Sequence, residues 1–260
     1  MQKFLAFLLS PLFVLAVSYE YAYRAVDPII PINQLQLEND YSPLNAHAHG
    51  MSNIFYLKPL FKIPPNRFVP VFQGVRFEFQ LVSTPKTSTS TATTNLGDTQ
   101  FFDLFLWAGK WWEVGIGPMA IFPTALNPLT GQGKWQAGPA FGFFLQLSQT
   151  QLGLLAQNPI SFAGNSHRPN QNYLLFQPLL FQHLKNGWYL KSNPQWTFDW
   201  IHHNNRLPLN FGVGRIFTLG GQPFNMDLVA EAMTYKTGSG FVPQFTIQFL
   251  FSILFEKEKG

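Results

Sequence analysis

Residues 241–255 read FVPQFTIQFLFSILF, with an apolar side chain at every odd position. Most even positions are polar, and Val242, Leu250 and Leu254 are the exceptions. Because successive side chains of a strand point to opposite faces, this pattern predicts a β-strand with one apolar and one mostly polar face. Fifteen residues exceed a typical strand of a soluble sheet but suit a tilted strand that crosses a membrane. Such an aromatic-rich strand at the C-terminus is expected to close an outer-membrane barrel against its first strand.

The composition also indicates a surface that faces lipid. Charged residues are 12% of the chain, about half the roughly 25% usual for soluble domains, whereas aromatic residues reach 17%. After the N-terminus no apolar run reaches the roughly eighteen residues that a spanning helix needs. Only a closed barrel then satisfies every backbone polar group in lipid. The predicted fold is therefore all-β, a transmembrane antiparallel up-and-down β-barrel.

The remaining totals exclude some functions. The chain has no Cys, so disulfides and thiolate chemistry are excluded. Its net charge of +4 is spread along the sequence and forms no basic stripe of the kind that binds nucleic acid.

The N-terminus reads as a secretory signal peptide. Lys3 is the charged residue, residues 4–17 are the apolar region, and small residues precede a cleavage site after Ser18, with Ala22 or Ala25 as other candidate sites. A retained anchor helix is the alternative, but the apolar run is short for a span. The predicted division is a signal peptide 1–18, a periplasmic segment 19–30, a barrel 31–255 and a polar tail 256–260.

Turn residues divide the barrel region into twelve strands. Long and short links alternate along most of the chain, as expected for external loops and periplasmic turns. A soluble sandwich or lipocalin-like barrel is the alternative, but it would place its apolar face inside. Here the apolar face carries Trp and Phe, which favours lipid contact. The expected strands are 31–41, 51–63, 67–83, 97–108, 111–125, 134–147, 151–163, 172–184, 188–201, 206–218, 224–236 and 241–255.

Two of these strands are ambiguous. In 97–108, Asp103 shares its face with Phe101 and Phe105, and either a bulge or a reversed local assignment would account for it. In 172–184 neither face is clearly polar.

Several sequence blocks resemble a known family. They read NLGDTQFFDLF at residues 95–105, then GIGPMAIFPTA, GQGKWQAGPAFGFF, LAQNPISFAG, NYLLFQPLLF, NGWYLKSNPQWTFDW, LNFGVGRIFTLGGQPFNMDLVAEA and FTIQFLF. In this order they resemble a bacterial outer-membrane barrel family that takes its name from the MetA pathway of phenol degradation. Its members are also labelled transporters and sometimes mislabelled neuromedin U. The resemblance covers 95–251 well and 28–83 loosely, and it implies a barrel with a transport role. The chain departs from the family after Phe255, where EKEKG follows, so Phe251 and Phe255 are both candidates for the assembly signal.

The polar faces of the strands supply the candidate binding residues. Side chains that face the lumen would guide or bind a small solute, although a small barrel can also fill its lumen with its own ion pairs. The candidates are Arg76, Glu78, Gln80, Lys191, Gln195, Asp199, Asp227, Glu231 and Gln248.

Metal and catalytic sites have weaker support. His47, His49, His202 and His203 are a candidate metal site, but solvated loop histidines are far commoner. A membrane-embedded hydrolase typically needs a Ser and a His two residues apart, and no His-x-Ser occurs. We therefore expect no catalytic residues, no metal and no cofactor.

These observations predict a passive channel or transporter in the bacterial outer membrane for small solutes, with aromatic or hydrophobic solutes as candidates. A structural or adhesive barrel with a filled lumen is the first alternative, and a lipid-modifying enzyme is the second. The expected partners are outer-membrane lipid, an unidentified small solute and the barrel assembly machinery, but no nucleic acid.

Overall fold

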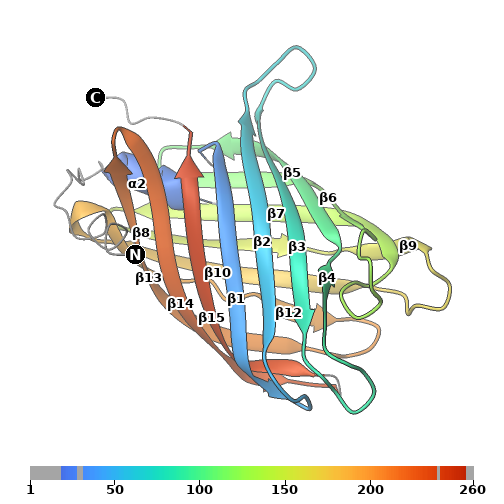
Figure 1. Ribbon diagram of the computed structural model, residues 1–260. Coiled ribbons are helices and arrows are strands. Elements are labelled where there is room, and N and C mark those ends of the chain that lie inside the picture. Colours follow the sequence, from blue (N-terminus) through green and yellow to red (C-terminus); the bar gives the residue numbers. More distant parts are fainter. Residues whose placement is uncertain (1–18, 28–31, 239–240, 256–260) are drawn as a thin grey trace.

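The structure, a computed structural model, describes residues 19–27, 32–238 and 241–255. This part of the chain forms a closed antiparallel β-barrel (Figure 1). The predicted signal peptide 1–18 and tail 256–260 lie outside the described residues. The elements are α2 (Tyr19–Val26), β1 (Gln34–Ala46), β2 (Ser52–Ile63), β3 (Phe72–Thr84), β4 (Thr93–Leu96), β5 (Thr99–Ala108), β6 (Trp112–Phe122), β7 (Lys134–Leu147), β8 (Thr150–Gln157), β9 (Ile160–Gly164), β10 (Tyr173–His183), the 3-10 turn η1 (Lys185–Gly187), β11 (Trp188–Ser192), β12 (Trp196–Asp199), β13 (Arg206–Leu219), β14 (Gln222–Lys236) and β15 (Val242–Leu254).

The last strand closes the barrel against the first, as predicted. Strand β15 pairs with β1 from Gln34↔Leu254 to Ala46↔Val242, and β10 pairs with β8 on the other side. The pairs β4 and β5, β8 and β9, and β11 and β12 each act as one interrupted strand, so the barrel has twelve strands. This confirms the predicted fold class.

Two predicted strands, 151–163 and 188–201, are interrupted for local reasons, and an additional short strand, β4, precedes the predicted strand 97–108. Pro159 separates β8 from β9, and Pro194 separates β11 from β12. Proline has no N–H to donate to a sheet ladder, so it ends regular pairing. Gly97 and Asp98 separate β4 from β5. Some strand ends also differ from the prediction: the first strand continues to Ala46, and the third begins only at Phe72.

The strand links define two ends of the barrel. At the short-turn end lie the links 109–111, 148–149, 184–187 and 220–221, the start of β1 and the end of β15, and also one longer link, 64–71. At the long-loop end lie 85–92, 123–133 and 165–172. The β13–β14 link is a two-residue hairpin, in which Gly220 and Gly221 have φ of 60° and 79°, as tight hairpin turns require.

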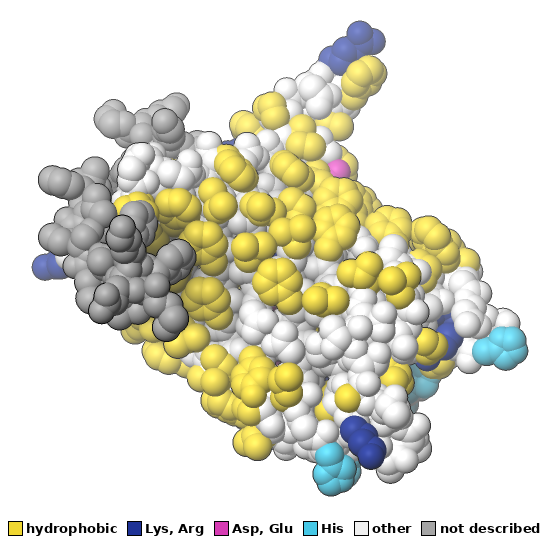
Figure 2. All heavy atoms as spheres, viewed as in Figure 1, with side chains coloured by type: hydrophobic (Ala, Val, Ile, Leu, Met, Phe, Trp, Pro, Cys, Tyr) yellow, Lys and Arg dark blue, Asp and Glu magenta, His cyan; other side chains and the backbone are white. Residues whose placement is uncertain are grey.

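The outer wall carries the apolar residues that the alternation predicted. On β15, Ile247 and Phe249 are exposed, whereas Thr246 and Ser252 are buried on the inside. Figure 2 shows apolar side chains covering much of the wall in this view. Exposed Trp side chains stand near both ends of the strands, as in interfacial aromatic belts; they are Trp107, Trp111 and Trp188 at the short-turn end and Trp135 and Trp200 at the other.

Asp103 points outward, and neither explanation left open for it is needed. The β5–β6 register is the same on both sides of it, with Phe102↔Met119 and Phe105↔Ile116. Its Oδ2 accepts a hydrogen bond of 2.8 Å from Nε2 of Gln73 on the neighbouring strand β3. A polar pair therefore joins β3 and β5 on the outer wall, whereas the inner face of β5 carries apolar residues.

The inner wall is not polar throughout, which corrects the simple prediction. Phe102, Leu104 and Met119 are buried on the inner faces of β5 and β6, and Phe144 is buried on that of β7. Strand β10 likewise buries Leu175, Leu179 and Phe181, which is why neither of its faces read as polar.

Helix α2 packs against this apolar wall. Its residues Tyr21, Ala22 and Ala25 belong to one buried cluster with Phe144 and Leu254. Figure 1 shows α2 near the start of β1 and the end of β15. The sequence did not predict a helix here, and the periplasmic location of 19–30 stays a prediction. Within the described residues, no helix has the length and apolarity that crossing a membrane requires.

Candidate functional site

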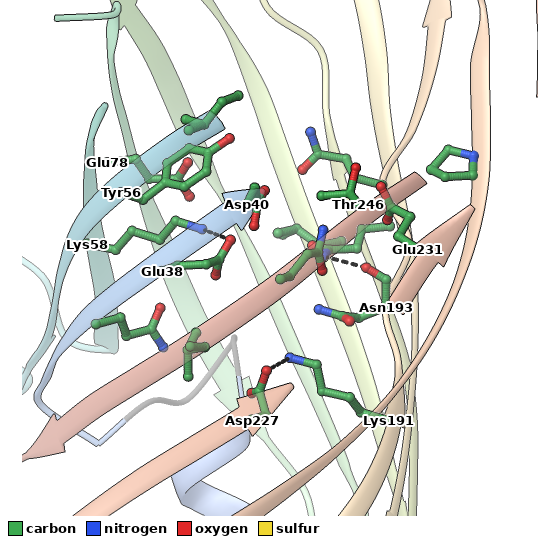
Figure 3. Close-up of a pocket in the computed structure, with 18 of the residues that line it drawn as sticks. Glu38, Asp40, Tyr56, Lys58, Glu78, Lys191, Asn193, Asp227, Glu231 and Thr246 are labelled. Carbon is green, nitrogen blue, oxygen red and sulfur yellow. Dashed lines mark hydrogen bonds and ion pairs between the residues drawn. The ribbon is translucent and has the colours of Figure 1, made fainter. Parts of the chain in front are cut away.

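The barrel encloses a cavity of about 420 Å³. The end of α2 borders it with Ala25, Val26 and Asp27, and its lining continues to Arg206 and Pro243 toward the long-loop end. Figure 3 shows that charged side chains from β1, β2, β3, β11 and β14 point into this space. The cavity therefore occupies the lumen beyond the helix.

One side of the cavity carries two ion pairs. Nζ of Lys58 on β2 donates a hydrogen bond of 2.9 Å to Oε1 of Glu38 on β1, and Nζ also lies 4.2 Å from the centroid of the Tyr56 ring. On β3, the guanidinium of Arg76 donates to the carboxylate of Glu78. Alternation along the strands places all five side chains inside, where the pairs compensate the cost of removing each charge from water.

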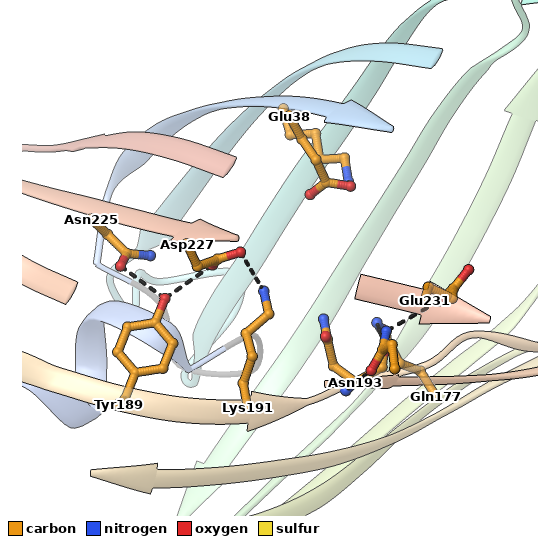
Figure 4. A network of polar contacts seen from close by, with 10 residues as sticks. Glu38, Gln177, Tyr189, Lys191, Asn193, Asn225, Asp227 and Glu231 are labelled. Carbon is orange, nitrogen blue, oxygen red and sulfur yellow. Dashed lines mark hydrogen bonds and ion pairs between the residues drawn. The ribbon is translucent and has the colours of Figure 1, made fainter. Parts of the chain in front are cut away.

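A second network joins β11 to β14 (Figure 4). Nζ of Lys191 donates to Oδ1 of Asp227 over 2.9 Å. The hydroxyl of Tyr189 lies 2.9 Å from both Oδ2 of Asp227 and Oδ1 of Asn225. The side chain of Asp227 is only 3% exposed, and Tyr189 is fully buried. The network is thus a fixed part of the lumen wall.

Glycines in β13 make this network possible. Strand β13 lies between β11 and β14, and in its register Gly212 pairs with Lys191 and Gly214 pairs with Asp227. A Cβ on Gly214 would lie 2.2 Å from the Tyr189 ring. The two glycines leave the inner surface of β13 bare, so side chains from the flanking strands can meet across it.

Two further acidic residues face the cavity without a cationic partner in the described ion pairs. Oε2 of Glu231 accepts a hydrogen bond of 3.1 Å from Asn210, and Oδ1 of Asp40 has no hydrogen-bond partner among the described residues. Nearby, the hydroxyls of Ser42 and Thr246 are 2.8 Å apart. These groups give the lumen hydrogen-bonding capacity that its own side chains do not use up.

Part of the cavity lining is apolar. Leu155 on β8, and Leu179 and Phe181 on β10, border the same space as the ion pairs. The lumen therefore offers an apolar wall and a polar wall to any solute that enters it.

Helix α2 is held at the short-turn end by specific contacts. The hydroxyl of Tyr23 donates to the carbonyl oxygen of Ser148 in the β7–β8 turn. Its ring meets His183 edge-on, with 4.3 Å between ring centroids, and His183 is itself 2.7 Å from Oε1 of Gln151. These contacts keep the helix over the end of the cavity.

Most predicted lumen residues do line the cavity. They are Arg76, Glu78, Lys191, Gln195, Asp227, Glu231 and Gln248. Their role in solute binding stays a prediction.

Asp199 and Gln80 are not among the lining residues. Oδ1 of Asp199 accepts hydrogen bonds from the backbone N–H groups of Ile201 and His202, so its carboxylate fixes the turn after β12. Gln80 lies opposite the lining residue Tyr56 in the β2–β3 register and has the inner parity of its strand. Neither residue therefore borders this cavity, and the lumenal role expected for both stays a prediction.

Several residues that line the same cavity were missing from the predicted candidates. Glu38 and Asp40 lie on β1 and Lys58 on β2, two strands from which no candidate was named, although alternation alone places their side chains on the inner face. Tyr189 shares its parity with Lys191, but an aromatic residue beside Trp188 reads as part of the lipid-facing belt.

The histidines give no metal site in the part of the chain that the structure describes, where no group of three or more His, Cys, Asp or Glu could hold an ion. His202 instead lies 3.4 Å from Oδ2 of Asp199.

Comparison with solved structures shows similarity to channel-forming barrels. The COG4313 outer membrane channel from Pseudomonas putida F1 has a TM-score of 0.63 at 13% identity, over 88% of this chain and 98% of that one. The NanC porin has a TM-score of 0.57 at 10% identity, over 85% and 99% of the two chains. Neither a protein-family model nor a curated protein matches the sequence. The chain thus has the fold of an outer-membrane channel barrel.

Proposed function

We propose that the protein is a passive channel of the bacterial outer membrane for small solutes, including aromatic and hydrophobic ones. The observation that carries this proposal is the cavity of about 420 Å³, which is lined by ion-paired side chains on one wall and by Leu155, Leu179 and Phe181 on another. Polar groups replace part of a solute's hydration, and the apolar wall holds its hydrocarbon part. The proposal agrees with the resemblance to the MetA-pathway family, which itself stays a prediction.

The contacts of α2 favour a gated channel. The helix and the cavity meet at Ala25, Val26 and Asp27, so a solute reaching the short-turn end must pass the helix. Moving α2 breaks the bond from Tyr23 to Ser148 and exposes Tyr21 and Ala22 to water. We therefore propose that the described arrangement is the closed state.

The same contacts support the second candidate, a structural barrel with a filled lumen. The apolar cluster around α2 and the three lumenal ion pairs form a packed interior of the kind that a small barrel can build. In that case α2 is a permanent part of the core.

Single-channel recording in planar bilayers separates the two candidates. A neutral hydrogen bond contributes about 1 kcal/mol, so Tyr23→Phe should raise the open probability roughly fivefold while it keeps the ring contact with His183. Tyr41→Phe, an exposed outer-wall residue, is the matched control and should leave gating unchanged.

Liposome swelling with a small aromatic solute provides the second measurement. A channel should admit the solute, and more rapidly in Tyr23→Phe. Absence of both conductance and swelling in the wild type and in Tyr23→Phe would refute the channel and leave the filled barrel.

A further inference from the structure

An apolar groove of about 370 Å³ lies on the outer wall near the short-turn end. It crosses β13 and β14, where Arg215 pairs with Met226, and in the next row Val213 pairs with Leu228. Leu228 in turn pairs with Phe249 of β15. The groove is lined by Trp188, Val213, Gly214, Arg215, Phe217, Met226, Asp227, Leu228 and Phe249. The carboxylate of Asp227 is paired with Lys191 on the lumen side.

Arg215 is the one cation in this groove, and it faces outward. It sits directly opposite Trp188 in the β11–β13 register, and its guanidinium carbon is 5.3 Å from the Trp188 ring. No ion pair involves it among the described residues, and its Nε has no hydrogen-bond partner there. The cost of an outward guanidinium on a wall that faces lipid rises with its depth in the membrane, and an anion from the membrane that meets it lowers this cost.

The position of Arg215 matches the depth of a lipid phosphate. It is four residues before the end of β13 at Leu219, and Trp188 begins β11 immediately after a short turn. Trp and Arg at strand ends lie at the level of headgroups, where the amphipathic ring and the snorkelling cation meet the interface. From Arg215 the groove continues over Met226 and Leu228 toward Phe249, away from that interface.

We propose that this groove binds one anionic phospholipid of the periplasmic leaflet. The phosphate receives the guanidinium of Arg215, which is suited to bidentate hydrogen bonds with phosphate oxygens. One acyl chain lies over Met226 and Leu228 and ends against Phe249. A phospholipid is the occupant because one molecule supplies both an anion for Arg215 and an apolar chain for the side chains that continue the groove. The site requires insertion in a membrane but not conduction, so it stands or falls separately from the proposed channel function.

Native mass spectrometry of the full-length protein, with added phosphatidylglycerol or phosphatidylcholine, tests the proposal. The wild type should retain one phosphatidylglycerol in preference to phosphatidylcholine. Arg215→Gln should lower the retained phosphatidylglycerol about fivefold, the factor that one interfacial cation typically contributes to anionic lipid binding. Arg67→Gln is the matched control, because Arg67 also lies over an aromatic ring, 4.8 Å from that of Phe68, but on the β2–β3 link outside the groove. It should bind lipid like the wild type.

A second variant tests the apolar part. Met226→Trp fills the groove without removing Arg215, and it should also reduce retention of phosphatidylglycerol. Heat modifiability on gels checks that each variant is a folded barrel. Equal retention by Arg215→Gln and the wild type, or equal retention of both lipids by the wild type, would overturn the proposal. The proposal would also be overturned if the wild type formed a lipid-free dimer and Met226→Trp abolished that dimer, because a second copy of the chain would then occupy the groove.

Discussion

Removing Lys191 should destabilise the barrel strongly, because it leaves a buried carboxylate without its cation. The side chains of Lys191 and Asp227 are 9% and 3% exposed, and their ion pair is 2.9 Å long. In Lys191→Met, Asp227 keeps only the hydroxyl of Tyr189 as a side-chain donor. Breaking such a pair on one side costs about 3–5 kcal/mol. We expect the lower figure, about 3 kcal/mol, because both residues border the cavity and water can enter it.

Urea unfolding of the protein refolded into phospholipid vesicles measures this loss. A loss of about 3 kcal/mol corresponds to a roughly 150-fold change in the folding equilibrium. The double variant Lys191→Met, Asp227→Asn should recover most of the lost stability, because a neutral amide needs no cation and its oxygen can still accept from Tyr189. Lys110→Met, an exposed change in the β5–β6 turn, should stay within about 0.5 kcal/mol of the wild type. If Lys191→Met costs less than about 1 kcal/mol, or if the double variant is no more stable than the single one, the pair is solvated and the reasoning is wrong.

Two further outcomes follow from the geometry. Gly138→Ala should lower the unfolding free energy by about 2 kcal/mol, because the new Cβ would lie 1.8 Å from the carbonyl oxygen of Asn158 and the backbone would have to move. Gly220→Asn is the control: its side chain enters open space at φ 60°, so it should change the unfolding free energy by less than about 0.5 kcal/mol. Equal effects of the two substitutions would contradict the packing argument. If the lumen conducts, Arg76→Glu should shift the reversal potential in a KCl gradient toward cation selectivity, whereas Asp199→Lys should not, because Asp199 fixes a turn and does not line the cavity. A shift of similar size in both variants would place Asp199 on the ion path.

The sequence alone predicted the closed barrel and the orientation of most strands. In lipid every backbone polar group needs a partner within the chain, and side chains alternate with a period of two. A polar residue in the pattern FTIQFLF therefore points inward, and Thr246 and Gln248 do so. Alternation by itself also predicts that Arg76, Lys191 and Asp227 face the same lumen.

Alternation gives the face of a residue but not its depth or its neighbours across the lumen. Lys191 and Asp199 have the same strand parity, yet Lys191 pairs with Asp227 inside the cavity, whereas the carboxylate of Asp199 accepts a hydrogen bond from the backbone of the turn after β12. The contact from Lys191 to Asp227 also depends on the register of β13, which brings bare glycine backbone between them.

The helix α2 and the outer groove were decided by tertiary structure. The residues of α2 carry no strand pattern, and their burial depends on an apolar inner wall that β5 to β10 build only when the barrel closes. The groove likewise exists because Trp188 on β11, Met226 on β14 and Phe249 on β15 come to line one surface around β13 only when these strands pair. Local periodicity specifies which way each side chain points, whereas strand register and closure specify what it meets there.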